Sequence, residues 1–162
     1  MSYPRVRFDG SAGAVSAAFR PRATPPDLAS ARGSVDCLAT GRTTAGEFGL
    51  YRWNMDHQVS GPDAHFHRTI SESFFVLEGT VRLYDGRRWI DAVAGDFLYV
   101  PVGGIHAFKN ESGTPASILL LFAPGAPREA YFEALAEMAT SGRQLTAQEY
   151  TEFLARHDQY MV

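Results

Sequence analysis

The chain has few of the features that mark secreted, membrane-bound or disulfide-stabilised proteins. Its 162 residues include one cysteine, Cys37, which has no partner in the sequence for a disulfide bond. The longest apolar run, 117–123, is far shorter than the ~18 residues of a membrane span. The first residues lack the apolar stretch of a signal peptide. We therefore expect a cytoplasmic protein that has no membrane partner.

A strong charge of either sign is also missing. The formal net charge is −3, and charged residues make up 20% of the sequence. Nucleic-acid-binding domains usually carry a basic surface, so we expect no nucleic-acid partner. Hydrophobic residues make up 45%, as in ordinary globular proteins, and the length predicts one domain. The chain is too short for an (αβ)₈ barrel of ~250 residues, which excludes the metal hydrolases built on that fold.

The residue pattern divides this domain into three parts. Residues 1–33 are rich in proline and glycine and have little apolar periodicity, so we expect an N-terminal arm. In residues 34–124, short segments rich in β-branched and aromatic residues alternate with turn residues, which predicts an antiparallel β-barrel or sandwich. Strands are predicted near 35–40, 47–54, 64–67, 73–77, 80–84, 88–93, 96–100, 106–110 and 116–122. In 47–54, alternation does not reveal which set of side chains faces inward.

Residues 125–162 change to a helical period. A first helix is predicted over 127–140, where apolar residues recur at helical spacing before Gly142. Thr146, followed three residues later by Glu149, has the pattern of a capping box that begins a second helix. We expect both helices to pack on the barrel.

Three histidines and a carboxylate carry the chemistry of the sequence. His65 and His67 are two residues apart, a spacing that places both imidazoles on one face of a strand. Glu72 follows beyond a short turn, and His106 lies in a later hairpin. Three imidazole nitrogens and one carboxylate oxygen suit a divalent first-row ion, namely Fe, Mn, Ni, Cu, Co or Zn.

Two spaced blocks surround these residues. His65 begins the pattern H-x-H-x4-E-x6-G, and Gly95 begins G-x5-P-x-G-x2-H-x3-N. Both blocks resemble the signature motifs of the cupin superfamily, and the resemblance covers about residues 46–123. The family's first block often begins with a glycine where this sequence has Val59, and the nearest glycine is Gly61. The C-terminal helices are similar to those of small bacterial cupins described as quercetin-dioxygenase-like.

This resemblance implies an all-β double-stranded β-helix, or jelly roll, with two C-terminal helices. It implies that His65, His67, Glu72 and His106 hold one metal ion at the mouth of the barrel. A homodimer is expected, because dimers are common in the family.

The neighbours of the four predicted ligands suggest a pocket. Even spacing from Glu72 places Phe74 and Val76 on the same strand face as Glu72, and even spacing from His106 places Phe108 on the same face as His106. These side chains would form an apolar wall that suits a small organic substrate, although they could equally be plain barrel core.

Three functions fit these residues. The first is a metal-dependent dioxygenase acting on a small organic, aromatic or flavonoid-like molecule, with Glu72 as both ligand and catalytic base. The second is a non-redox Lewis-acid enzyme such as a polyketide cyclase, isomerase or lyase. The third is a cupin that binds a small ligand without turnover. One fold supports many reactions, so the fold does not choose among them.

Overall fold

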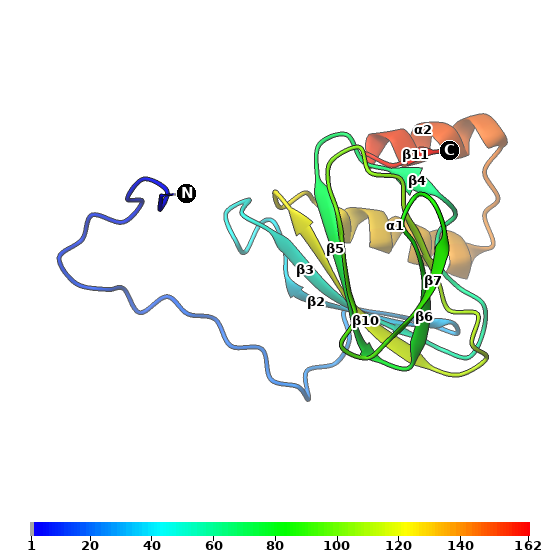
Figure 1. Cartoon of the computed structure of the whole chain (residues 1–162), viewed down its shortest axis with the longest axis horizontal. Coiled ribbons are helices and arrows are strands. Elements are labelled where there is room, and N and C mark those ends of the chain that lie inside the picture. The colour runs from blue at the N-terminus through cyan, green and yellow to red at the C-terminus, as the bar shows by residue number, and fades with distance from the viewer. Residues whose placement is uncertain (1) are drawn as a thin grey trace.

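The computed structural model describes residues 2–162 as a β-barrel with two helices packed against it (Figure 1). The strands are β1 (Leu28–Ser30), β2 (Gly33–Ala39), β3 (Gly49–Met55), β4 (His65–Phe66), β5 (Ser71–Glu78), β6 (Thr80–Tyr84), β7 (Trp89–Val93), β8 (Phe97–Val100), β9 (Ala107–Lys109), β10 (Ala116–Ala123) and β11 (Tyr160–Met161). The helices are α1 (Arg128–Ser141) and α2 (Ala147–Arg156).

Antiparallel pairing joins the strands into three sheets. The largest has the order β1-β2-β3-β10-β5-β8, the second β7-β6-β9, and the third pairs β11 with β4. This arrangement confirms the predicted all-β barrel, and each predicted strand overlaps an observed one. No helix among residues 2–162 is long and apolar enough to cross a membrane.

The core lies between the sheets and under the helices. Its largest members come from the inward faces of β3, β5 and β10, namely Tyr51, Phe74, Ile118, Leu120 and Phe122. Burial of Tyr51 settles which residues of 47–54 face inward. Tyr51 and Trp53 point to the core side, whereas Phe48 is 36% exposed.

The N-terminal segment leaves the barrel as an extended chain (Figure 1). Residues 2–19 are exposed throughout, and Met1 lies outside the described residues. The structure places a strand, β1, inside the expected arm of residues 1–33. Leu28 pairs with Val35, and Ser30 pairs with Gly33 across a tight turn. A strand of three residues is too short to produce a recognisable alternation.

The C-terminal segment folds back onto the barrel. The capping box of α2 is confirmed: the Thr146 hydroxyl accepts from the Glu149 backbone N–H, and the Glu149 carboxylate accepts from the Thr146 N–H. After α2, β11 pairs with β4, with Tyr160 opposite Phe66. The sequence analysis missed β11. This pairing brings the end of the described chain beside the strand that carries His65.

Candidate metal centre

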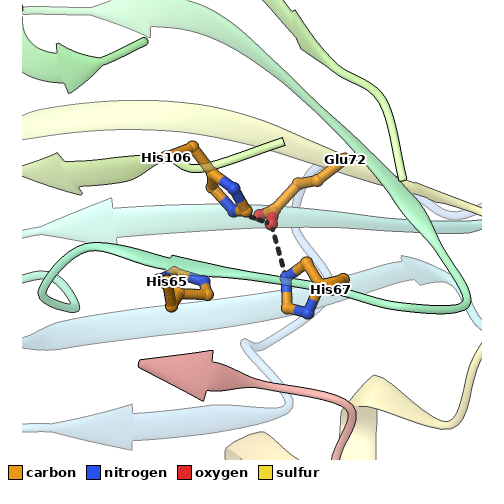
Figure 2. Close-up of side chains that lie close together, drawn as sticks. All are labelled: His65, His67, Glu72 and His106. Atoms are coloured by element: carbon orange, nitrogen blue, oxygen red, sulfur yellow. Dashed lines mark hydrogen bonds and ion pairs between the residues drawn. The ribbon is translucent and has the colours of Figure 1, made fainter. Parts of the chain in front are cut away.

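The four predicted ligands converge in the interior of the barrel. One candidate ligand atom from each of His65, His67, Glu72 and His106 lies within 4.8 Å of the other three. All four side chains are buried, and none is more than 3% exposed. Figure 2 shows them pointing toward one another, His65 and His67 from one segment of the chain and Glu72 and His106 from two others.

Strand pairing explains why residues far apart in the sequence meet. The His65 backbone N–H donates to the His106 carbonyl at 3.0 Å, and the His106 N–H donates to the His65 carbonyl at 2.9 Å. Directly paired residues on antiparallel strands place their side chains on the same face. The Gly103 N–H donates to the His67 carbonyl at 2.8 Å, and Gly103 has a φ of 79°, a backbone conformation that glycine adopts without strain.

Each imidazole is oriented by a backbone carbonyl at Nδ1. The partners are the Asp63 carbonyl for His65 at 2.8 Å, the Gly104 carbonyl for His106 at 2.9 Å, and the Asp158 carbonyl for His67 at 2.5 Å. A carbonyl requires the proton to be on Nδ1, which leaves the lone pair of Nε2 for a metal. Two of these supports lie two residues away in the chain, whereas Asp158 comes from the segment after α2.

Glu72 lies between two of the histidines. Its Oε2 lies 2.8 Å from His106 Nε2 and 3.1 Å from His67 Nε2 (Figure 2). Without an ion, it accepts a hydrogen bond from these nitrogens when they carry a second proton, and a bound ion would take the place of that proton. Burial alone would raise the pKa of Glu72, but these two hydrogen bonds outweigh it and hold the pKa well below its usual range. Burial would lower the pKa of His106, and the bond to Glu72 reverses this and raises it. Burial, together with the charge of His106, lowers the pKa of His65 to about 4.

These features fit a metal ion. The carboxylate is ionised, His65 is neutral at physiological pH, and all three Nδ1 atoms are occupied by carbonyl groups. A three-imidazole, one-carboxylate set leaves open positions on a five- or six-coordinate ion. The four residues can therefore hold one divalent ion that remains accessible to a small molecule.

A cavity of about 460 Å³ opens beside this group, with His65 and Glu72 in its wall. Its remaining walls are mainly aromatic and aliphatic, and they include Trp53, Phe108, Leu120, Phe122, Tyr131, Phe132 and Leu135. Such walls with a few polar groups are typical of sites for small organic ligands.

The three residues predicted to line a pocket differ in position. Phe108 lines the cavity. Phe74 lies in the core with its ring 5.7 Å from that of His106, and Val76 is fully buried in the same strand. Neither Phe74 nor Val76 is among the described residues that line the cavity. Their contact with a substrate stays a prediction.

Sequence reasoning missed two residues that the fold brings to the site. Arg128 lines the cavity from the first turn of α1 and is 4% exposed, and burial lowers the pKa of its guanidinium. Asp158 supports His67 through its carbonyl. A cation in the first turn of a helix is electrostatically unfavourable, and for Arg128 this was an available signal.

Three other polar residues lie outside the group. His57 is exposed and contacts Asp56, and His157 is partly buried between Tyr131 and Phe153. The Asn110 side-chain amide donates to the Asp56 and Thr114 carbonyls, which ties together two loops.

Comparison with known proteins agrees with this geometry. A family model described as "Cupin domain" matches residues 51–122. Quercetin 2,3-dioxygenase of Bacillus subtilis (strain 168) is 33% identical over 48 residues, which are 30% of this chain. The match spans only 14% of the length of that relative.

Solved structures share the fold. An RmlC-like cupin from Shewanella frigidimarina NCIMB 400 aligns with a TM-score of 0.55 and 20% identity, covering 67% of this chain and 89% of its own. The polyketide cyclase RemF from Streptomyces resistomycificus aligns with a TM-score of 0.51 and 22% identity, covering 60% of this chain and 68% of its own. The barrel is thus the expected double-stranded β-helix. Its residues 51–122 match the cupin domain.

Proposed function

We propose that the chain is a mononuclear metal-dependent enzyme, a dioxygenase that acts on a small aromatic, flavonoid-like substrate. One observation carries the proposal: four buried donor groups converge, and two of them, His65 and Glu72, line a largely aromatic cavity. The choice of dioxygenase is supported by the local likeness to quercetin 2,3-dioxygenase.

Each residue of the centre would have a defined role. His65, His67, His106 and Glu72 would hold the ion, each imidazole through Nε2. The bound ion supplies Lewis acidity and open positions for oxygen ligands. Glu72 would accept the proton of a substrate hydroxyl at Oε2 if it swings off the ion and its histidine partners, because its ionised carboxylate lies in the cavity wall. The aromatic walls would exclude water and orient the ring of the substrate.

A second candidate is non-redox chemistry of the polyketide cyclase kind. The same four donors support it, because Lewis-acid catalysis needs an ion with an open position and no oxidant. The polyketide cyclase RemF shares the fold. The two candidates differ in their dependence on O₂, which can be measured.

The test begins with elemental analysis of protein purified without chelators or a nickel column. We expect about one transition-metal ion per chain, and O₂ uptake when quercetin is added. His65→Ala and His106→Ala should each lower the metal content to near zero, because loss of one of four donors leaves an incomplete site. His57→Ala is the matched control, since His57 is exposed and outside the group, and it should retain the metal.

The outcomes separate the candidates. Metal without O₂ uptake, together with conversion of a polyketide under anaerobic conditions, would favour the second candidate. Protein without metal, unchanged by either alanine variant, would overturn both.

We also propose that the enzyme forms a homodimer. The outer face of the large sheet exposes apolar side chains on β5 and β8, namely Phe75, Phe97 and Tyr99. Exposed apolar patches of this kind are typical of interfaces between proteins.

A further inference from the structure

Arg128 is a buried cation at the edge of the proposed active site. It is 4% exposed and lines the same cavity as His65 and Glu72. Its guanidinium carbon lies 4.3 Å from the ring centre of Tyr131 and 5.0 Å from that of Phe122. The cation is therefore surrounded by aromatic faces instead of water.

The hydrogen-bonding capacity of Arg128 is not filled. A guanidinium has five N–H donors. Nη1 donates to the His157 carbonyl at 2.8 Å, and Nη2 makes a long contact of 3.4 Å to Gln159 Oε1. Within residues 2–162, Nε has no acceptor at all.

The charge of Arg128 is also unpaired. No carboxylate among the described residues lies within ion-pair distance of it. Its neighbour Glu129 is engaged by the Tyr51 hydroxyl at 2.8 Å. Burial of a charge without a counter-charge is costly, and the helix N-terminus adds to the cost because it is itself positive. An anion placed here would pair with the Arg128 guanidinium and with the positive N-terminus of α1.

We propose that Arg128 binds an anionic oxygen of the substrate, so that the cavity takes an aromatic molecule that carries a carboxylate or an ionised hydroxyl group. Arginine is well suited to this role because its planar donors match such oxygens. The inference deepens the proposed function, since it places the anion in the cavity that the metal centre shares.

Phe122 relates Arg128 to the metal centre. The Phe122 ring faces the Arg128 guanidinium. The centre of the same ring lies 6.3 Å from the centre of the His67 ring. Phe122 is thus a neighbour of both Arg128 and the metal-binding group. A ligand in the shared cavity would carry its anionic group to Arg128 and its reacting oxygen to the centre.

A purely structural role would be the alternative. Arg128 joins the start of α1 to residues after α2 through His157 and Gln159. That role predicts a loss of stability on substitution, with no preference for an anionic ligand. A preference for an anionic over a neutral ligand therefore distinguishes the binding role of Arg128 from the structural role.

The experiment compares 2-naphthoate with its neutral isostere 2-naphthamide by titration calorimetry. The protein is treated with chelator, so that a bound metal cannot supply the anion preference. We expect wild type to bind 2-naphthoate about tenfold more tightly than 2-naphthamide, the size of one charge-assisted contact. In Arg128→Met the preference should fall to about twofold or less, with naphthamide binding unchanged.

Two further variants complete the design. Arg156→Met removes an exposed arginine of α2 and should keep the wild-type preference. Arg128→Lys keeps the charge but loses the planar donors, so 2-naphthoate should bind about fivefold more weakly than to wild type while naphthamide is unaffected. If Arg128→Met does not fold, the binding of the two probes by wild type and by Arg128→Lys tests the inference.

Equal binding of both probes by wild type would overturn the inference. So would a folded Arg128→Met, or an Arg128→Lys, that binds 2-naphthoate as wild type does. Because the measurement uses neither metal nor turnover, a failure to consume O₂ leaves this result standing, and the two proposals fail separately.

Discussion

The two ends of the chain contribute very differently to the molecule. Residues 2–19 are exposed throughout, and their ion pair with the barrel joins Arg7 to Glu47, both well exposed. Residues 157–162 are fewer but reach the metal centre, because the Asp158 carbonyl accepts from His67 Nδ1. The length of a segment therefore says little about its part in the site.

Asp158 shows how the C-terminal segment is fixed. Its carboxylate accepts from the backbone N–H of Arg68, from the backbone N–H of Thr69 and from the Thr69 hydroxyl. It has a φ of 55°, which few residues other than glycine and asparagine or aspartate adopt. This turn directs the carbonyl to His67 and leads the chain into β11. The support of one proposed ligand is thus built by a segment outside both sequence blocks that carry the ligands.

The largest expected effect follows from removal of residues 157–162. The deletion removes the carbonyl partner of His67, the pairing of β11 with β4 and both acceptors of Arg128. Loss of a group that orients a ligand typically weakens metal binding by about 10–100-fold, and we expect that range for Co²⁺ measured by competition with a chromophoric chelator. The thermal midpoint should fall by about 5–10 °C, since several hydrogen bonds of about 1 kcal/mol each are lost.

Asp158→Asn provides the matched control for that deletion. It retains the backbone carbonyl and a side chain that tolerates the positive φ, but it removes the negative charge. Co²⁺ affinity should stay within about threefold of wild type. A deletion protein that binds Co²⁺ as tightly as wild type would show that the His67 orientation does not depend on this segment.

An intermediate effect is expected at alkaline pH from Tyr131 in α1. Burial raises the pKa of Tyr131 to about 12, against the opposing charge of Arg128. In the unfolded chain the phenol ionises near pH 10. The folded protein therefore binds the phenol proton of Tyr131 more tightly than the unfolded chain does. The resulting contribution to stability is fully present below about pH 10 and is lost as the pH rises toward about 12.

The variant Tyr131→Phe measures this contribution. The free energy of unfolding, measured in urea, decreases between about pH 9 and pH 11.5. In Tyr131→Phe this decrease should be smaller than in wild type by on the order of 2 kcal/mol. Tyr3→Phe changes a ring that is 99% exposed, and it should leave the alkaline curve unchanged. Identical slopes for Tyr131→Phe and wild type would contradict the assignment.

Local pattern was sufficient for most of the fold. The strand at 80–84 was predicted with its observed bounds, because β-branched and aromatic residues end there at a turn. The Thr146 capping box needed only two residues at fixed spacing. The four donors were predicted for the same reason, since their spacing is a property of the sequence. Strand pairing then brings them together in the interior of the barrel.

What could not be predicted depends on contacts between distant segments. Strands β1 and β11 are too short to show alternation, so only their pairing partners define them. The inward set of β3 depended on which face the helices cover, and Tyr51 packs on Phe132 of α1. Asp158 and Arg128 reach the site by tertiary folding alone. The position of Arg128 in the first turn of a helix marks it as unusual, but nothing in the sequence places it near Glu72.

The smallest effect is expected from removal of residues 2–19. These side chains are exposed, and an ion pair between exposed groups such as Arg7 and Glu47 adds little to stability. Arg20, which contacts Asp27, is retained in this variant. The thermal midpoint should shift by about 2 °C or less, and Co²⁺ affinity should not change.

Light scattering on the same variant tests whether residues 2–19 contribute to the proposed dimer interface. Phe75, Phe97 and Tyr99 remain exposed on the outer sheet face, so the shortened chain should have the mass of two copies. A deletion protein that becomes monomeric would mean that residues 2–19 contact a second copy. In that case the N-terminal segment would stabilise the dimer, as the C-terminal segment stabilises the site. Both ends would then matter, and they would differ in whether they contact a second copy or the same chain.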